Sequence, residues 1–409
     1  MFKNCGIILV NEHSRKEIFI MAYFSIGVVA LMAVFALVGV FDKVFLKNKL
    51  GLGDEFQSGI ELIGPLCLAI VGIIALVPEI AWVIEHTLTP LYVKLGLDPS
   101  MAVTAILAID MGGFQLAESV AQNPTIGQWA GVVYGSMMGA TIVFSIPVGL
   151  AAIQKKDVSA FSKGILYGIA AIPVGTFVGG LLLGLDALLV LKNLIIPIAF
   201  SAIIVVCLAL WTKATTKVFI VFSEFVNICA LLGLGLAIIN DLVLIPISGT
   251  GAFDIANVPF FNILGPTSEG IAVAGAVGIV LAGALPFVAC LNKILRKPLR
   301  KFSEKTGATE AGVTGFLLSC ANNMAMFATM SKMKEREKIL NVAFAVCAAF
   351  VIGDHLAFAA ANASDCIAPM MAAKLISGII AVVIAAIFTK NVKNDEIVSE
   401  EATEEEKGE

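Results

Sequence analysis

Long apolar segments recur along most of this chain, and they restrict its fold more than any other feature. Each holds about 20 residues with few charges, the length that a helix needs to cross a hydrocarbon core of roughly 30 Å. There are eleven, near residues 21–41, 59–82, 99–120, 129–150, 161–185, 190–211, 218–239, 269–292, 310–331, 338–361 and 368–388. Hydrophobic residues make up 59% of the chain and charged residues only 14%, whereas soluble domains are close to half apolar and a quarter charged. The sequence therefore predicts an all-α, multi-pass protein of the inner or plasma membrane.

The positions of lysine and arginine indicate how many of these segments cross the membrane, because short cytoplasmic loops are rich in both residues. If all eleven crossed, the two most basic loops, 293–301 and 332–338, would face opposite compartments. If 99–120 and 310–331 instead enter and leave on one side, every strongly basic loop lies in the cytoplasm. Non-helical backbone is tolerated at membrane depth where protein or a water-filled cavity surrounds it. We expect about nine transmembrane helices plus two re-entrant, broken segments, with eleven full spans as the alternative.

The chain also has the pattern of an internal duplication. One offset of 211 residues aligns Gly59 with Gly270, Gly72 with Gly283 and Gly96 with Gly307. We predict two repeats, 21–185 and 218–388, joined by a connecting helix at 186–217. A leader at 1–20 and an acidic, disordered tail at 389–409 complete the division. With two hairpins the repeats point in opposite directions, which is the architecture of secondary transporters that bind substrate near the bilayer midplane.

Polar residues interrupt both predicted hairpins. Asp110 lies in the first, and Gly112 and Gly113 after it allow backbone conformations that a helix does not; Asn322 and Asn323 lie at the matching place in the second. A charged side chain at the membrane centre costs about 2.5–3.5 kcal/mol on insertion scales, so it marks a functional site by default. The alternative for Asp110 is that it caps the following half-helix, since aspartate is a preferred N-cap residue.

Other candidate binding residues lie within the apolar segments. They are Phe114, Gln115, Thr141, Glu224, Asn227, Asp354 and His355. Glu224 and Asn227 are three residues apart and so share a helix face, although a hydrogen bond to another helix explains Glu224 as well. For His355, packing or helix linking is the competing explanation. Asp42 and Asp241 lie at span ends, where we expect solvated carboxylates.

Carboxylates and amides, with no lysine or arginine expected at membrane depth, describe a cavity for a small cation that donates hydrogen bonds. Phenylalanine rings beside them can add a cation–π contribution of about 0.5–2 kcal/mol. The chain has no phosphate-binding or dinucleotide glycine motif and no zinc motif, and its eight cysteines stand singly, so we expect neither an enzyme nor a cofactor or metal. Nothing suggests a nucleic-acid partner. The glycine-rich run at 175–184 permits close helix approach within or between subunits, which leaves a homo-oligomer open.

Two stretches are similar to a known family. IDMGGFQLAES at 109–119 and GSMMGATIVFSIPVGL at 135–150 resemble the motifs of the ethanolamine utilisation permease family, the EutH-type transporters. The resemblance extends from about residue 21 to residue 388. It implies a membrane carrier or facilitator for ethanolamine, and it carries over site roles to Asp110, Gly112, Gly113 and Thr141 only. The leader and the acidic tail depart from the usual family length.

Two other functions compete with this one. A sodium- or proton-coupled carrier of another small polar solute, such as a nucleoside or an amino acid, would use a similar hairpin fold. A membrane sensor or scaffold that transports nothing would use the acidic tail to recruit a partner. Protein-dependent flux of the amine distinguishes a transporter from a scaffold, and ion gradients distinguish the kinds of transporter.

Overall fold

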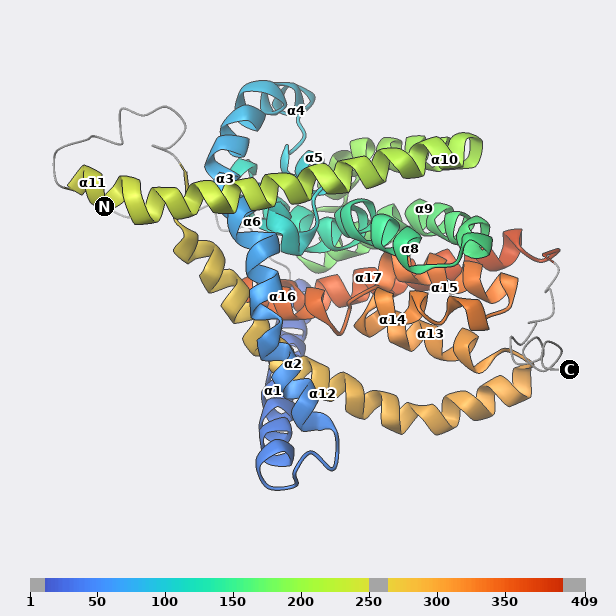
Figure 1. The fold of residues 1–409 in the computed structure, drawn as a ribbon. Coiled ribbons are helices and arrows are strands. Elements are labelled where there is room, and N and C mark those ends of the chain that lie inside the picture. Colours follow the sequence, from blue (N-terminus) through green and yellow to red (C-terminus); the bar gives the residue numbers. More distant parts are fainter. Residues whose placement is uncertain (1–11, 250–263, 393–409) are drawn as a thin grey trace, which may run out of the picture.

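The computed structural model describes residues 12–249 and 264–392, and within them the chain is almost entirely helical (Figure 1). The helices of the first half are α1 (Glu12–Val44), α2 (Leu52–Glu61), α3 (Ile63–Thr87), α4 (Thr89–Leu95), α5 (Ser100–Thr104), η1 (Ile109–Gly113), α6 (Phe114–Val120), α7 (Pro124–Gln128), η2 (Trp129–Gly139), η3 (Thr141–Ser145), α8 (Ile146–Ala152), η4 (Lys155–Asp157) and α9 (Val158–Leu182). Those of the second half are α10 (Ala187–Ile239), η5 (Asn240–Leu244), α11 (Ile245–Gly249), α12 (Thr267–Thr306), α13 (Glu310–Ala321), α14 (Asn323–Phe327), η7 (Met330–Lys332), α15 (Glu335–Ala348), α16 (Asp354–Asn362), η8 (Ser364–Cys366) and α17 (Ile367–Phe388). No strand occurs in the described ranges, as the all-α prediction requires.

Seven helical stretches of the described residues are long and apolar enough to cross a membrane, which confirms the multi-pass prediction. They are Ile20–Val44, Leu52–Thr87, Pro124–Ala152, Lys155–Leu182, Ala187–Ile247, Thr267–Thr306 and Ser364–Phe388. The difference from the nine expected has two causes. The 61-residue stretch contains both predicted spans at 190–211 and 218–239, and the backbone of Trp211 leaves the helical conformation between them (φ −133°, ψ 48°). The segment at 338–361 is divided into α15 and α16 and is therefore too short to count.

The first predicted hairpin, 99–120, is not one of the seven spans, and its two ends lie together. The carboxylate of Asp98 accepts hydrogen bonds from the backbone of Ser100 at 3.0 Å and from the backbone of Asn123 at 3.1 Å. The side chain of Asp98 thus connects Ser100, at the start of the segment, to Asn123, just after its end. The chain must return to the side from which it started, as a re-entrant segment does.

The second hairpin, 310–331, has a carboxylate in the same role. Glu337 accepts a hydrogen bond from the backbone of Thr309 at 2.9 Å and another from the backbone of Lys334 at 3.0 Å. The nitrogen of Thr309 precedes the segment and that of Lys334 follows it, so this segment also begins and ends at one level. The helices before the two hairpins end at Gly96 and Gly307, both left-handed at φ 67° and 69°.

The contact between α2–α3 and α12 bears on the predicted duplication. A Cβ atom on Gly59 would lie 2.4 Å from the nitrogen of Ala282, and one on Gly270 would lie 2.6 Å from the Cα of Val71. In the 211-residue alignment Gly59 corresponds to Gly270, and Val71 corresponds to Ala282. The two contacts are therefore the same contact with the roles of the two segments exchanged. Such an exchange is what a two-fold relation between the two segments requires, and beyond this contact the two inverted repeats stay a prediction. The proposed tail from residue 393 and the first 11 leader residues lie outside the described residues.

Close backbone contact also holds α3 against α10. A Cβ atom on Gly72 would lie 1.7 Å from the carbonyl oxygen of Ala230. We expect Gly72→Ala to separate these helices and to destabilise the protein by about 1–3 kcal/mol, the usual cost of overpacking. Gly64→Ala, on the same helix with no atom within 4 Å of the added Cβ, should leave thermal stability unchanged or slightly raised. Thermal unfolding of both variants in detergent is the measurement, and equal midpoints would contradict the close contact.

Asp42 corrects one sequence prediction. The expected solvated carboxylate is fully buried and accepts hydrogen bonds from the backbone of Leu52 at 2.8 Å and of Gly53 at 3.1 Å. Asp241 is partly buried and accepts from the backbone of Thr267 at 3.0 Å. Each carboxylate satisfies amides at the start of the next long helix, which have no partner within that helix. Both side chains are therefore structural.

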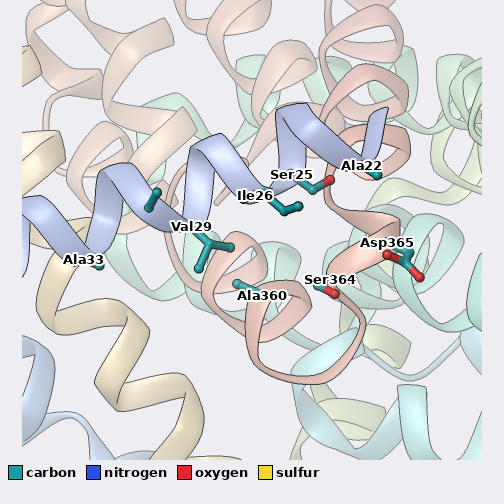
Figure 2. Close-up of a pocket in the computed structure, with 9 residues that line it drawn as sticks. Ala22, Ser25, Ile26, Val29, Ala33, Ala360, Ser364 and Asp365 are labelled. Atoms are coloured by element: carbon teal, nitrogen blue, oxygen red, sulfur yellow. The ribbon is translucent and has the colours of Figure 1, made fainter. Parts of the chain in front are cut away.

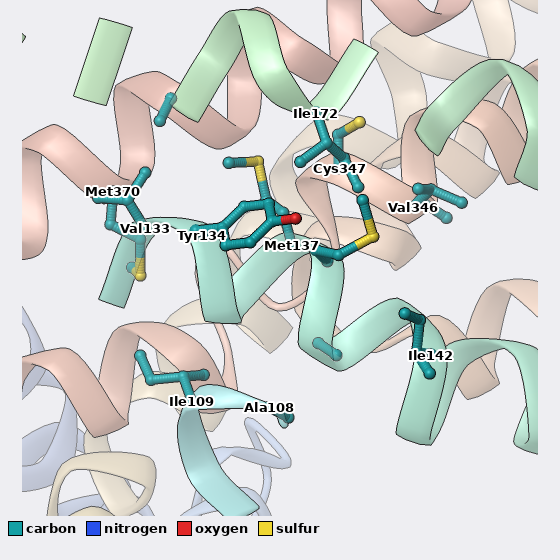
Figure 3. Close-up of a cluster of buried hydrophobic side chains, with 14 of the residues drawn as sticks. Ala108, Ile109, Val133, Tyr134, Met137, Ile142, Ile172, Val346, Cys347 and Met370 are labelled. Atoms are coloured by element: carbon teal, nitrogen blue, oxygen red, sulfur yellow. The ribbon is translucent and has the colours of Figure 1, made fainter. Parts of the chain in front are cut away.

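The main hydrophobic core lies where the first hairpin meets η2, α9, α15 and α17 (Figure 3). Tyr134, Met137 and Cys347 are completely buried there. Thr141, at the junction of η2 and η3, donates its hydroxyl to the carbonyl of Met137 at 2.7 Å and also lies 3.2 Å from the carbonyl of Val346. π-Helical turns such as these are rare and occur often at functional sites.

Candidate functional site

The break in the first hairpin is produced by two residues. Met111 (φ −114°, ψ 39°) and Gly112 (φ 79°, ψ −3°) leave the helical conformation inside η1, just before α6. A positive φ favours glycine, and a Cβ atom at Gly112 would lie 2.1 Å from Cγ2 of Ile73 on α3. The N-cap of α6 is Gly113, without a side-chain hydrogen bond. The structure thus places Asp110 at the break but gives it no capping role.

A further break lies between α15 and α16, where the sequence analysis predicted a continuous span. The backbone of Phe350 donates to the carbonyl of Ser319 and that of Ile352 to the carbonyl of Cys320, both at 3.0 Å. These bonds to the end of α13 satisfy backbone groups that the interrupted helix leaves free. As a result, Asp354 stands at the first position of α16 and not in the middle of a helix.

The two breaks meet at one cavity of about 290 Å³. Its polar lining comes from Asp110, Asp354, Asn227 and Ser223. Its apolar lining consists of Leu62, Pro65, Leu66, Ala69, Met111, Val143, Phe144, Val148 and Leu281. Asn227 is near the middle of the predicted span 218–239, from which we infer that the cavity lies near mid-depth in the membrane. Charged side chains at that depth normally face such a cavity or a partner.

A buried lysine contradicts the expectation that no basic residue lies at membrane depth. Lys374 is on α17, inside the span Ser364–Phe388, and has no exposed surface. Its ammonium donates to the carbonyl of Ser136 at 2.6 Å and lies 3.1 Å from Nδ1 of His355. It is also within electrostatic reach of Asp110, which in turn interacts with Asp354. The single lysine in the apolar run IAPMMAAKLISG was the signal that could have found it.

Three predicted site residues, Phe114, Thr141 and His355, are buried and are not part of the cavity lining. Phe114 is buried and packs edge to face on Phe358 of α16, with ring centroids 5.7 Å apart. His355 is buried between Lys374 and the ring of Phe350, which matches its helix-linking interpretation. Thr141 is completely buried, and its hydroxyl contacts the carbonyl groups of Met137 and Val346.

The two asparagines of the second hairpin differ in role. Asn322 breaks the helix with an extended backbone (φ −157°, ψ 125°), and its side chain caps α14 by accepting from the backbone of Met324 at 2.8 Å. Asn323 is completely buried and donates to the hydroxyl of Ser145 at 2.9 Å. Ser145 ends η3, from which Val143 and Phe144 line the cavity. Asn323 therefore supports the cavity wall from behind.

Two predicted site residues lie elsewhere. Glu224 is exposed on α10. Ser223 beside it is buried, and its hydroxyl donates a hydrogen bond to the carbonyl oxygen of Val143 at 2.6 Å. Glu224 is not among the residues that line the cavity, whereas Asn227, three residues further along the helix, is. Gln115 is partly buried on α6 and is not among the lining residues. The prediction that these two side chains join Asp110 is not supported by the structure.

Another hollow lies between α1 and the α16–η8 corner (Figure 2). Small and aliphatic side chains of α1 line it, including Ala22, Ile26 and Val29, and Ser364 and Asp365 stand at one end. Asp365 is exposed and is the only charged residue of the lining. The described cavity with two carboxylates is thus the better candidate for binding a cation.

Residues 25–388 match the model of the family described as "Ethanolamine utilisation protein, EutH". The chain is 42% identical over 359 residues to a protein of Listeria monocytogenes named "Probable ethanolamine permease EutH", covering 87% of this chain and 92% of that one. It is 37% identical over 358 residues to a protein of the same name from Escherichia coli, covering 83% and 86%. It is also 38% identical over 366 residues to the uncharacterised protein YxeR of Bacillus subtilis, covering 89% and 94%. No solved structure matches the chain.

Proposed function

Since this chain belongs to the EutH family of ethanolamine utilisation proteins, we propose that it is a membrane carrier or facilitator that takes up ethanolamine in its protonated form. The family match and the names of the curated relatives support a permease. The choice of cation depends on the cavity, in which Asp110 and Asp354 face the same space. Two carboxylates on one cavity can offset the cost of taking an ammonium group out of water.

The charge of the site carries this proposal. Asp110 lies within electrostatic reach of two charged groups, the ammonium of Lys374 and the carboxylate of Asp354. With all three ionised, one negative charge is left over, and a single protonated amine balances it. An anion would add to that excess charge and be repelled, and a dication would reverse it. The amide of Asn227 offers an oxygen that can accept the hydrogen of the substrate's hydroxyl group.

A protein is needed for this transfer because the charged form does not cross lipid. A primary alkylamine titrates near the value of lysine, about 10.4, so only on the order of one molecule in a thousand is neutral at pH 7. Acidification reduces that fraction tenfold for each pH unit. Protein-dependent uptake should therefore account for a larger share of total uptake as the pH falls from 8 to 6.

The direct test uses purified protein in liposomes and radiolabelled ethanolamine. We expect uptake that saturates with substrate, exceeds that of empty liposomes at pH 6, and is inhibited by small primary amines but not by carboxylates. A protein-free rate at every pH would favour the sensor or scaffold. Strong inhibition by a nucleoside or a zwitterionic amino acid, with none by amines, would favour the other carrier.

Ion gradients across the same vesicles test the mechanism. A facilitator equalises the ethanolamine concentration on both sides whatever the gradient. A coupled carrier accumulates ethanolamine above the outside concentration when an inward Na⁺ or H⁺ gradient is imposed. Replacement of one gradient by the other identifies the coupling ion.

A further inference from the structure

A basic pocket lies away from the central cavity, between the first turns of α9 and the end of the first helical stretch of α10. It encloses about 390 Å³. Its polar lining consists of Ser159, Ser162, Lys163, Thr212 and Lys213. The loop before α9 carries Lys155 and Lys156, so the positive-inside rule puts this end of the molecule in the cytoplasm.

The two lysines of this pocket have no acidic partner among the described residues. The nearest carboxylate in the sequence, Asp157, is used by Lys338, whose ammonium donates to it at 2.6 Å. The positive charges of Lys163 and Lys213 are thus left for a ligand. Both side chains are exposed at the pocket, which permits a bulky group to reach them.

Two more donors point to an anionic ligand. Ser162 is only 7% exposed, and its hydroxyl has no hydrogen-bond partner among the described residues although the residue lines the pocket. The 25-residue helix α9 begins without a side-chain cap, and its first residues Val158 and Ser159 line the pocket, so the positive end of its dipole lies there. A hydroxyl donor and the positive end of a helix dipole both favour the binding of a phosphate group.

The wall of the pocket indicates where the phosphate comes from. Leu166 and Leu208 give it an apolar side. Just beyond it, Leu210 is 65% exposed and Trp211 is 60% exposed, and tryptophan is enriched at the level of lipid headgroups. The acyl chain of a phospholipid can lie along this apolar surface while the headgroup of the same lipid occupies the pocket. A free phosphate ion would leave the apolar surface uncovered.

We propose that this pocket binds the phosphate headgroup of an anionic phospholipid of the cytoplasmic leaflet. Basic pockets between transmembrane helices on that side bind such headgroups in other membrane proteins. Lys163 and Lys213 would neutralise the phosphate, and Ser162 would donate a hydrogen bond to it at the positive end of α9. The lipid would join α9 to α10 across the kink at Trp211.

The test measures lipid binding by the full-length protein in detergent, by native mass spectrometry, with phosphatidylglycerol and phosphatidylcholine. We expect phosphatidylglycerol to be retained in preference. The double variant Lys163→Gln/Lys213→Gln should bind it about thirtyfold more weakly, since each lysine near an anionic headgroup contributes about a fivefold factor. The matched control Lys155→Gln/Lys156→Gln removes the same charge from the same side without touching the lining, and should change binding less than threefold.

Three results would overturn the proposal. The first is equal binding of the two lipids by the wild-type protein. The second is an equal loss in both double variants, which would indicate only a general surface charge. The third is displacement of phosphatidylglycerol by inorganic phosphate at equimolar concentration, which would identify a site for the free ion. A size-exclusion profile and a thermal midpoint like those of the wild type establish that each variant is folded, and Ser162→Ala provides an independent variant if either pair is not.

Discussion

Asp110→Asn is expected to reduce ethanolamine uptake in proteoliposomes by about a hundredfold. The substitution keeps the size of the side chain but removes the negative charge that is left over in the cavity. With Asp354 and Lys374 still present, the site becomes neutral and no longer compensates an ammonium for its lost hydration. Removal of one member of a buried, hydrogen-bonded charge pair costs about 2–5 kcal/mol of binding, and about 2.7 kcal/mol corresponds to a factor of one hundred.

Glu224→Gln is the matched control for this variant. It removes one acidic charge from the same depth of the membrane, but its side chain is exposed on the outer face of α10. We expect its uptake to stay within twofold of the wild type. Equal losses in the two variants would show that general charge, and not the cavity, governs uptake. Full uptake by Asp110→Asn would remove Asp110 from the site.

Lys374→Met is expected to have the second-largest effect, and it acts on both stability and transport. The ammonium is completely buried and balances one of the two cavity carboxylates. Its removal leaves two uncompensated negative charges, and breaking a buried charge pair in this way costs about 3–5 kcal/mol. Thermal unfolding in detergent should show a midpoint lowered on the order of 5 °C or more, with uptake reduced at least tenfold.

The double variant Lys374→Met/Asp354→Asn decides whether charge balance is the cause. It restores one net negative charge to the cavity, so we expect it to be more stable than Lys374→Met and to regain part of the lost uptake. This is a strongly non-additive result, as expected for residues that act as one unit. If the double variant is less stable than Lys374→Met by the full effect of Asp354→Asn alone, the two residues are independent and the charge argument fails.

The two hairpins could be predicted from the sequence because the residues at their breaks, glycine and asparagine, favour backbone conformations that interrupt a helix. Gly112 adopts a positive φ at the first break, and Asn322 caps the half-helix after the second. The basic loops supplied the remaining constraint, since a hairpin at 310–331 brings the two richest clusters to one side and a second at 99–120 places the other basic loops there too. The carboxylates of Asp98 and Glu337 hold the ends of these segments together as that prediction requires.

Three features of the site could not be predicted in this way. The break before Asp354 is stabilised by backbone bonds to Ser319 and Cys320, more than 30 residues away, so no local signal marks it. The direction of Glu224 depends on the rotation of α10 against its neighbours, which helical spacing alone does not define. The contact of His355 with Lys374 at 3.1 Å depends on how α16 packs against α17.

The sequence by itself determined that this protein lies in a membrane and where its helices break. Apolar runs of membrane length show the first, and glycines and asparagines within those runs show the second. A few charges within the runs mark a function, because they are too costly to keep in lipid without one. These are properties of single segments, and they act over a few residues. Only the tertiary structure decided which charges share a cavity, because that depends on contacts between segments far apart in the chain. Asp110, Asp354 and Lys374 come from three separate elements, and their combined charge exists only once those elements pack together.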